Sequence, residues 1–414
     1  MAETYPLEPR LTVAMLGARR RYAVPRIFAQ EGWLELFYTD LYAAAPWLNR
    51  LRSSPPPNEE LRKALGRSAA DIPADRVRQF PLFGLSRIAA ARAATNPSAR
   101  LRSYRKWNHA FCRRVVRGGL GPANGVYVFN TAGLEIARTA REQGLKIFVD
   151  QITAPWQVEE SILKEERQRW PNWESGATSE GDWRPLADRE AQEWALADCI
   201  LCGSAFVQEG IGKVAGPVEK CRVVPYGNAS GSLAHAIRKP QAGPLRVLFV
   251  GTIQLRKGIQ YLAEAARSLP ANTAEFRAVG PIRVAREAAR GIAAHIELRG
   301  ALSRDSLLRE YQWADVLALP SLSEGSANVC YEALAAGLPV IATPNSGSVI
   351  RDGEEGFIVP IRESGAIRDR LQRLADDRDL LNRLAENARS RAGEFSHEAY
   401  GRRLTGVISE AYNP

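Results

Sequence analysis

The sequence predicts an α/β protein with two domains, because apolar strand patterns and helical patterns alternate in both halves of the chain. In the first half, the buried-strand patterns Leu11 to Leu16 and Val126 to Asn130 are each followed by a helical pattern. In the second half, Leu245 to Gly251 and Val316 to Leu319 are followed in the same way. A length of 414 residues suits two or three domains. The Ser-, Gly- and Pro-rich stretch 229–243 predicts the linker between them.

Composition and charge indicate which partners and which cellular location to expect for the protein. The formal charge of +10 favours negatively charged partners, although the Arg excess is spread along the chain. Denser clusters at 19–21 and 100–117 are candidates for peripheral contact with an anionic membrane, the alternative being solvated Arg side chains. No nucleic-acid-binding motif is recognised, so we expect no nucleic acid partner. No apolar run reaches the about 18 residues of a membrane span and no signal-peptide pattern is present, which predicts a cytoplasmic protein, with membrane association at the cytoplasmic face as an option.

The five cysteines do not indicate a disulfide framework, because their number is odd and the expected compartment is reducing. Cys199 and Cys202 form a CxxC spacing within a predicted strand. Residues three apart on a strand point to opposite faces. We therefore interpret both as core residues rather than as a redox or zinc pair.

The predicted first domain places polar residues where its strands end. Parallel strands open their ligand crevice at their carboxyl ends, so Asn130, Thr131, Asp150 and Gln151 are expected near a cleft. Thr131 is also a candidate N-cap for a helix from Gly133 to Gln143. The loop after the first strand lacks a G-x-G-x-x-G fingerprint, which argues against a dinucleotide there. The triplet Arg19 to Arg21 lies in that loop. It either contacts a phosphate group or the acceptor, or it is simply exposed to solvent.

Three further segments of the first half are less regular. The stretch 43–68, with Pro55 to Pro57, predicts a long excursion rather than a domain boundary. The stretch 84–117 is helical in pattern, and its aromatics at 104, 107 and 111 share one face, which favours core packing over a partner groove. The segment Trp156 to Trp183 predicts a helix and an irregular loop over the acceptor side. Ser204 is a plausible cap for the helix that it precedes.

The strongest pattern is a strand, loop, helix and strand unit at 316–342. Its loop Pro320 to Gly325 and its helix Ala327 to Ala336 carry two carboxylates, Glu324 and Glu332. Backbone amides from Gly325 to Asn328 are expected to be unpaired at the start of the helix, where they suit oxygen-rich or anionic groups. This unit therefore predicts a ligand site.

The same unit resembles a known family. Glu324, seven intervening residues, Glu332 and then Ala-Leu-Ala-Ala-Gly-Leu-Pro-Val-Ile-Ala-Thr resemble the motif of retaining glycosyltransferases of family 4, a group 1 glycosyl transferase family. The resemblance implies the GT-B fold, in which two Rossmann-like domains face each other across a cleft. It also implies an acceptor-binding domain at 1–228, a nucleotide-sugar donor-binding domain at 244–394, and a helix at 395–414 that crosses back to the first domain.

The resemblance carries residue roles onto this sequence. Arg256 and Lys257 match the family's basic pair, which holds the donor phosphates. Glu332 matches the residue that hydrogen-bonds the ribose, and Glu324 matches the residue beside the donor sugar. Cations at a helix start are unfavourable unless an anion is present, which favours the phosphate role. The implied catalytic residues are Glu324, Arg256 and Lys257, and the implied donor-binding residues are Gly251, Arg256, Lys257, Ser326, Ala327, Asn328, Val329 and Glu332. Many family members have a His where this chain has Asn130 and Thr131, so a His-based role is not expected.

The implied function is retaining transfer of a hexosyl unit from a UDP- or GDP-sugar to a glycan or lipid-linked acceptor, in the synthesis of cell-surface polysaccharide or glycolipid. No cofactor and no metal are expected in this scheme. Two alternatives remain, a nucleotide-sugar epimerase of similar fold and a non-catalytic nucleotide-sugar-binding protein. An epimerase would need acid and base residues at the sugar, and no such cluster is evident in the sequence.

Overall fold

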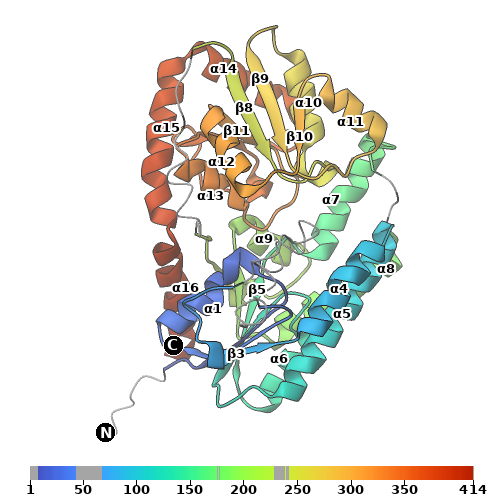
Figure 1. Cartoon of the computed structure of the whole chain (residues 1–414), viewed down its shortest axis with the longest axis vertical. Helices are drawn as coiled ribbons and strands as arrows, with labels where there is room; N and C mark the ends of the chain where they lie inside the picture. The colour runs from blue at the N-terminus through green and yellow to red at the C-terminus, as the bar shows by residue number, and fades with distance from the viewer. Residues whose placement is uncertain are drawn as a thin grey trace, which may run out of the picture.

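The computed structural model describes residues 8–42, 68–174, 176, 178–227, 238 and 242–413. These residues form two domains, each built on a parallel sheet with helices on both faces, and the two sheets lie at opposite ends of an elongated molecule (Figure 1). The prediction of an α/β fold with two facing domains is confirmed. The predicted excursion at 43–67 and all of the predicted linker except residues 238, 242 and 243 lie outside the described residues.

The first sheet has seven strands in the order β3-β2-β1-β4-β5-β6-β7. Its strands are β1 Leu11–Met15, β2 Leu34–Thr39, β3 Val77–Gln79, β4 Gly125–Phe129, β5 Lys146–Gln151, β6 Cys199–Cys202 and β7 Cys221–Val223. The helices along this part of the chain are α1 Ala23–Gln30, α4 Pro81–Ala93, α5 Pro97–Gly118, α6 Leu134–Glu142, α7 Trp156–Arg169, α8 Glu180–Leu196 and α9 Ala205–Lys213.

The second sheet has six strands in the order β10-β9-β8-β11-β12-β13. Its strands are β8 Leu245–Val250, β9 Ala274–Val279, β10 Glu297–Gly300, β11 Val316–Leu319, β12 Val340–Ala342 and β13 Gly356–Ile358. The helices that follow them are α10 Ile259–Ser268, α11 Arg286–Ala293, α12 Arg304–Trp313, α13 Asn328–Ala335, α14 Ser364–Asp376 and α15 Arg378–Ala392, and the chain ends in α16 His397–Tyr412.

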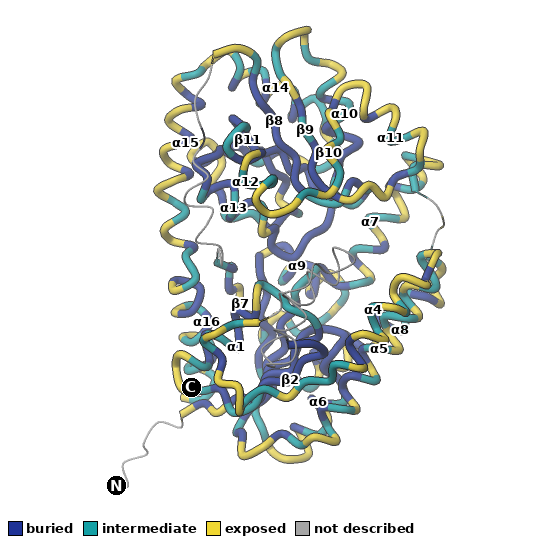
Figure 2. Tube along the Cα trace, viewed as in Figure 1, coloured by how far each residue is buried: buried dark blue, intermediate teal, exposed yellow. Residues whose placement is uncertain are grey.

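Both sheets are buried on their two faces, as parallel sheets must be (Figure 2). In β1, alternate residues enter different cores. Leu11 and Val13 pack with α1 and α16, whereas Ala14 packs with the layer that includes α5 and α6. Cys199 and Cys202 divide between the same two cores, and both are buried free thiols. Their interpretation as core residues is confirmed.

The strand orders fix where a ligand crevice forms. In each sheet the order reverses beside the first strand, so β1 is paired with β2 and β4, and β8 with β9 and β11. Loops that leave the two central strands at such a reversal diverge to opposite faces and open a crevice at the carboxyl ends. The loops after β8 and β11 are those that carry the predicted donor residues.

Three local predictions for the first domain are wrong. The helical stretch at 84–117 is two helices, because Asn96 caps α5 through its side chain and Pro97 occupies the first turn. Thr131 does not cap α6, whose N-cap is Gly133. Instead the Glu193 carboxylate of α8 accepts from the backbone amides of Thr131 (2.6 Å) and Gly133 (2.9 Å). Ser204 occupies the N-cap position of α9, but its hydroxyl donates to the carbonyl of Gly325 in the second domain rather than capping the helix.

The Trp-rich segment contains the predicted helix and reaches the second domain. Helix α7 runs from the first domain up to the second, where it packs on the short helix η5 Leu255–Lys257 (Figure 1). Trp170 and Trp173 then pack against the core of the second domain. The helix predicted in this segment is confirmed as α7, and the segment connects the two domains. Its position over the acceptor side remains a prediction.

Charge anchors α7 to the second domain. Glu166 is fully buried and accepts from Tyr261 Oη (2.8 Å), Gln260 Nε2 (3.1 Å) and Arg362 Nε (2.5 Å). The last helix makes the opposite crossing, since α16 follows the second domain but packs against α1 in the first. The domains are thus joined by two crossing helices in addition to the linker.

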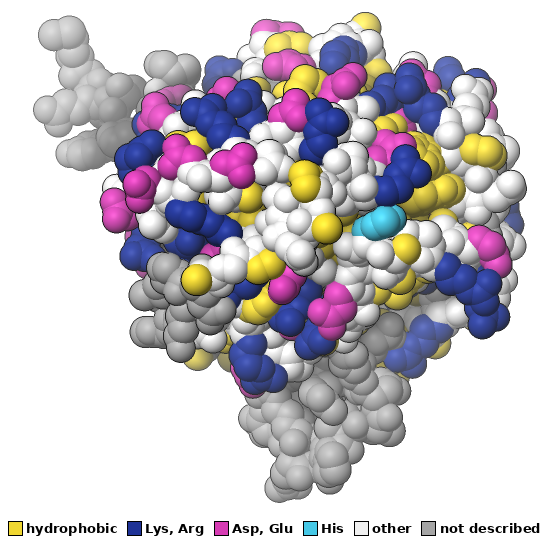
Figure 3. Space-filling view, turned by 90° about the horizontal axis from the view of Figure 1, so that it is seen from above, with side chains coloured by type: hydrophobic (Ala, Val, Ile, Leu, Met, Phe, Trp, Pro, Cys, Tyr) yellow, Lys and Arg dark blue, Asp and Glu magenta, His cyan; other side chains and the backbone are white. Residues whose placement is uncertain are grey.

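The surface shows no single basic field at the second-domain end. Seen from that end, Lys and Arg alternate with Asp and Glu over the visible face (Figure 3). None of the helices in the described segments combines the length and the apolar composition that a membrane crossing requires.

Replacing Glu166 by Ala tests the anchoring role of α7. We expect a loss of about 3 kcal/mol in the free energy of unfolding, because Arg362 and the two polar groups beside it lose a buried anion. Urea unfolding followed by Trp fluorescence measures it, since Trp170 lies in this contact. The matched control is Glu165→Ala, whose half-exposed carboxylate also pairs with Arg362 (2.8 Å) and should contribute under about 1 kcal/mol. Equal losses in the two variants would contradict the anchor.

Candidate functional site

Two loops of the second domain meet at the carboxyl ends of β8 and β11. The loop after β8 ends at Gly258, whose φ of +70° lies in the left-handed region. A Cβ atom there would stand 1.9 Å from the carbonyl oxygen of Pro320 in the loop after β11. Only glycine satisfies both the backbone angle and this contact. The close approach brings the basic side chains of the first loop onto the carboxylate of the second.

The predicted catalytic residues form one cluster. Lys257 Nζ is ion-paired with Glu324 Oε1, and Arg256 Nη1 lies 3.4 Å from Glu324 Oε2. Arg256 Nη1 also donates to the carbonyl of Ser323 (2.6 Å), and Ser321 Oγ donates to Glu324 Oε1 (3.1 Å). Residues separated by about seventy positions in sequence therefore share one hydrogen-bonded group.

The oppositely charged groups in this cluster stabilise each other's charged forms. Glu324 is 8% exposed, and burial alone would favour its neutral form. The charges of Lys257 and Arg256 outweigh burial and hold the pKa of Glu324 below its ordinary value. Burial likewise opposes the charge of Arg256, but Glu159 and Glu324 raise its pKa.

A carboxylate that the sequence did not reveal belongs to the same cluster. Glu159 of α7 accepts from Ser323 Oγ (2.9 Å), and its Oε2 lies 3.8 Å from Arg256 Nη1. Further along the same segment, Glu174 Oε1 accepts from the amide of Leu255 (2.7 Å), which precedes Arg256. The segment that crosses between the domains thus supplies two carboxylates to the basic loop. Only the packing of α7 on η5 reveals this contact.

The hydrogen bond that Glu332 accepts comes from a residue outside the ion cluster. It sits in the second turn of α13, where its carboxylate accepts from Tyr311 Oη (2.8 Å). Burial raises its pKa, although the Tyr311 hydrogen bond partly offsets that effect. Its role at the ribose remains a prediction.

The start of α13 is less open than predicted. The amide of Ala327 donates to the carbonyl of Ser346 (3.1 Å), so it is not unpaired. Ser326 Oγ is engaged with Tyr331 Oη (2.7 Å) and the carbonyl of Gly347 (3.0 Å). Asn328 is exposed and Val329 half-buried. Sugar or phosphate contacts in this stretch are therefore most accessible at Asn328.

Gly251 is the remaining predicted donor-binding residue, and it has extended backbone geometry at the end of β8. Its amide donates to the carbonyl of Val279 (2.9 Å). A Cβ atom on it would stand 3.6 Å from the Lys257 side chain. It thus lies directly beside one cation of the cluster.

On the first-domain side, Arg20 occupies the crevice after β1. Its guanidinium is 2.7 Å from Asp150 Oδ2 and lies 3.6 Å from the centre of the Tyr226 ring. The residues at 20–22 have three consecutive left-handed backbone conformations, each unfavourable by about 1 kcal/mol or more for a non-glycine residue. The packing of Arg20 holds this loop in place. The alternative that Arg20 is simply exposed to solvent is therefore wrong.

The other predicted cleft residues of the first domain are held by a buried carboxylate. Glu190 of α8 accepts from Asn130 Nδ2 (2.8 Å), Gln151 Nε2 (2.8 Å) and the amide of Trp156 (2.9 Å). Burial raises the pKa of Glu190 to about 8, against the effect of these three donors. Asn130 and Gln151 thus position the ends of β4 and β5 and the start of α7.

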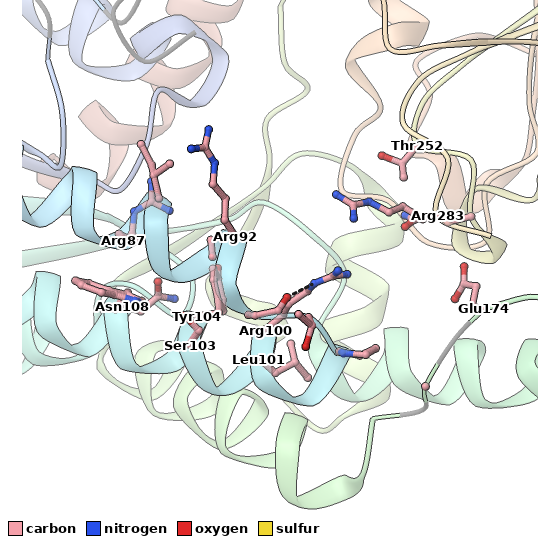
Figure 4. A pocket seen from close by; sticks show the side chains of 18 of the residues that line it. Arg87, Arg92, Arg100, Leu101, Ser103, Tyr104, Asn108, Glu174, Thr252 and Arg283 are labelled. Atoms are coloured by element: carbon pink, nitrogen blue, oxygen red, sulfur yellow. Dashed lines mark hydrogen bonds between the residues drawn. The ribbon is translucent and has the colours of Figure 1, made fainter. Parts of the chain in front are cut away.

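The domains touch at the loop that carries Glu324. A Cβ atom on Gly325 would stand 1.7 Å from the carbonyl oxygen of Ile152 in the first domain, so only glycine fits there. A cavity of about 1100 Å³ is lined by α4, α5 and α7 on one side and by the loops after β8 and β9 on the other (Figure 4). The space between the domains is therefore bordered by both of them.

This geometry defines a class of protein. Two facing parallel α/β domains with a crevice between them are also found in the solved structure of Anabaena HepE in complex with UDP and glucose, at a TM-score of 0.61 and 14% identity, over 97% of this chain and 100% of that chain. The lipopolysaccharide glycosyltransferase WaaG is similar at a TM-score of 0.60 and 17% identity, over 96% of this chain and 99% of that chain. The fold is GT-B.

The second domain carries the similarity to a known family. Residues 244–377 match the family model described as "Glycosyl transferases group 1", so the resemblance read from the motif around Glu324 is confirmed. Alpha-D-kanosaminyltransferase of Streptomyces kanamyceticus is 32% identical over 174 residues, which are 40% of this chain and 45% of that protein. The glycosyltransferase LpsE of Rhizobium meliloti, named for lipopolysaccharide core biosynthesis, is 28% identical over 210 residues, 49% of this chain and 61% of that protein. The chain thus matches about half the length of these relatives.

The position of Glu159 yields a prediction about nucleotide binding. Glu159→Gln should bind UDP about three- to tenfold more tightly, because a diphosphate at Arg256 would no longer be repelled by this carboxylate. Isothermal titration calorimetry with UDP measures the change. Glu209→Gln, an exposed carboxylate of α9, serves as the control and should leave the affinity unaltered. Weaker binding in Glu159→Gln would place the diphosphate elsewhere.

Proposed function

We propose that the protein is a retaining glycosyltransferase that moves a hexosyl unit from a UDP- or GDP-sugar to a hydroxyl of a glycan or lipid-linked acceptor. The products are a new glycoside, the nucleoside diphosphate and a proton. The bond that breaks joins the anomeric carbon to the diphosphate, and the bond that forms joins that carbon to the acceptor oxygen.

The observation that carries this proposal is the cluster of Arg256, Lys257 and Glu324 at the reversal of the second sheet. As the anomeric bond breaks, negative charge grows on the departing diphosphate. Two cations fixed in a largely buried site stabilise that charge without having to reorganise. Glu324, directly beside them, is placed to contact the sugar.

Retention at the anomeric carbon is part of the proposal and follows the motif that contains Glu324 and Glu332. An acceptor that attacks on the face from which the diphosphate departs gives a product with the configuration of the donor. The anomeric configuration of the product, measured by proton NMR, tests this point.

The setting of the reaction is also proposed. A relative named for lipopolysaccharide core biosynthesis supports a role in cell-surface polysaccharide or glycolipid synthesis. Donors of this kind are made in the cytoplasm, so we place the protein there, with peripheral contact at the cytoplasmic face of a membrane through its Arg-rich helices and without a nucleic acid partner.

Removal of the two cations tests the leaving-group role. The Arg256→Ala and Lys257→Ala double variant should lose at least about 100-fold in turnover, because nothing replaces the charge at the diphosphate. A panel of nucleotide sugars, with nucleotide release and sugar isomers both measured, identifies the donor. Isomer formation without an acceptor would favour an epimerase instead.

The control for this variant is Arg290→Ala, which removes an exposed cation of α11 in the same domain. It should retain the turnover of the unmodified protein. If the double variant retained its turnover as well, the phosphate assignment of Arg256 and Lys257 would be wrong.

We also propose that transfer needs neither a cofactor nor a metal ion, since Arg256 and Lys257 supply the positive charge that a cation would bring to the diphosphate. Among the described residues, no three His, Cys, Asp or Glu side chains gather as metal ligands. Turnover should be unchanged, within about twofold, when EDTA is added in excess over all divalent ions. Loss of turnover with EDTA and its recovery with Mg²⁺ or Mn²⁺ would refute this point.

A further inference from the structure

The cavity between the domains has a lining unlike that of the donor site. Helices α4 and α5 form one wall, and the loops after β8 and β9 form the other (Figure 4). Thr252 and Gln254 of the β8 loop line it, and that loop continues directly into Arg256. The loop that carries the proposed donor-phosphate residues therefore also lines this cavity, and the opposite wall comes from the first domain, where the acceptor is expected.

Cations from both walls face this cavity. Arg100 of α5 and Arg283 of the β9 loop are both exposed and line it from opposite sides. Arg100 donates through Nε to the carbonyl of Ala94 (3.1 Å). Within the described part of the chain, neither guanidinium has a carboxylate partner. Arg87, Arg92 and Arg167 also line the cavity. Asp40 neutralises Arg87, and Glu160 neutralises Arg167.

Negative charge in the lining is limited to one residue. Glu174 is the sole carboxylate among the described lining residues, and its Oε1 is occupied by the amide of Leu255. An anion of the ligand would therefore meet guanidinium groups from both walls and little repulsion. Guanidinium groups bind phosphate and carboxylate in this way with several hydrogen bonds each.

The rest of the lining suits a sugar ring. Tyr104, Trp107 and Trp156 line the cavity and are half-buried, so their rings are accessible for stacking. Asn108, also in the lining, is 1% exposed, and its Oδ1 has no hydrogen-bond partner within the described structure. A buried carbonyl oxygen without a donor is unfavourable, and a ligand hydroxyl would satisfy it.

We propose that this cavity is the acceptor site and that it takes a sugar bearing a phosphate or carboxylate. The anionic group binds between Arg100 and Arg283, and the ring packs on the aromatic wall with a hydroxyl donated to Asn108. The volume of about 1100 Å³ accommodates more than one ring. This assignment rests on the proposed function, which it narrows to acceptors that carry negative charge.

The test measures binding to the protein saturated with UDP, so that added anions cannot occupy the donor's phosphate site. Glucose, glucose 1-phosphate and glucuronate are titrated by calorimetry. Glucose 1-phosphate and glucuronate should bind at least about tenfold more tightly than glucose. In the Arg100→Gln and Arg283→Gln double variant this preference should disappear, with the affinity for UDP unchanged. Arg105→Gln, an exposed Arg of α5 outside the lining, should keep it.

Equal binding of glucose and glucose 1-phosphate, or an unchanged preference in the double variant, would overturn the proposal. UDP and GDP binding are measured first on their own, and GDP replaces UDP throughout if only GDP binds. Failure of both to bind would contradict the proposed function rather than the acceptor site. A glucosyl phosphate carried on a farnesyl chain in detergent micelles distinguishes the source of the ligand. Tighter binding of that compound than of glucose 1-phosphate indicates a lipid-linked acceptor, and equal binding a soluble one; either result supports the anionic site.

Discussion

The candidate site depends on one close contact, the packing of Gly258 against the carbonyl of Pro320. Each partner belongs to a loop that leaves a central strand of the second sheet, and those loops would otherwise diverge. Their contact puts Lys257 and Arg256 onto Glu324. A side chain larger than hydrogen at position 258 would separate the loops and disperse the charges. The sheet reversal thus supplies the crevice, and a single glycine supplies the geometry within it.

The second constraint is the crossing helix α7, which makes the site a property of both domains. Its buried Glu166 fixes it to the second domain, while the buried Glu190 of α8 holds its first residue, Trp156, to the first domain. Between these two anchors lies Glu159, beside Arg256. A change in the angle between the two domains must therefore move Glu159 relative to at least one of the domains. The charge balance at the proposed phosphate site is coupled in this way to domain position.

Much of the fold could be predicted because it rests on local patterns. The strand β11 has the predicted bounds, and the helices α6 and α13 begin and end within one residue of theirs. The break between α4 and α5 was also readable from Asn96 and Pro97, but the continuous helical pattern obscured it. The clustering of Arg256, Lys257 and Glu324 followed from motifs in two neighbouring loops. Tertiary partners could not be predicted, since nothing near Glu193 or Ser346 in sequence indicates that they bind amides far along the chain.

The ligand-free cluster already contains the charges that a donor would bring. Glu324 and Glu159 occupy Lys257 and Arg256, so two carboxylates stand where the proposed diphosphate needs to bind. A diphosphate must displace or outcompete at least one of them, and Glu159 is the weaker competitor because it lies 3.8 Å from Arg256 and accepts from Ser323. Glu324 is held by Ser321 as well as by both cations. Under the proposed function, donor binding is an exchange of anions on fixed cations. Glu324 would stay to meet the sugar, and Glu159 would yield its contact between α7 and Arg256.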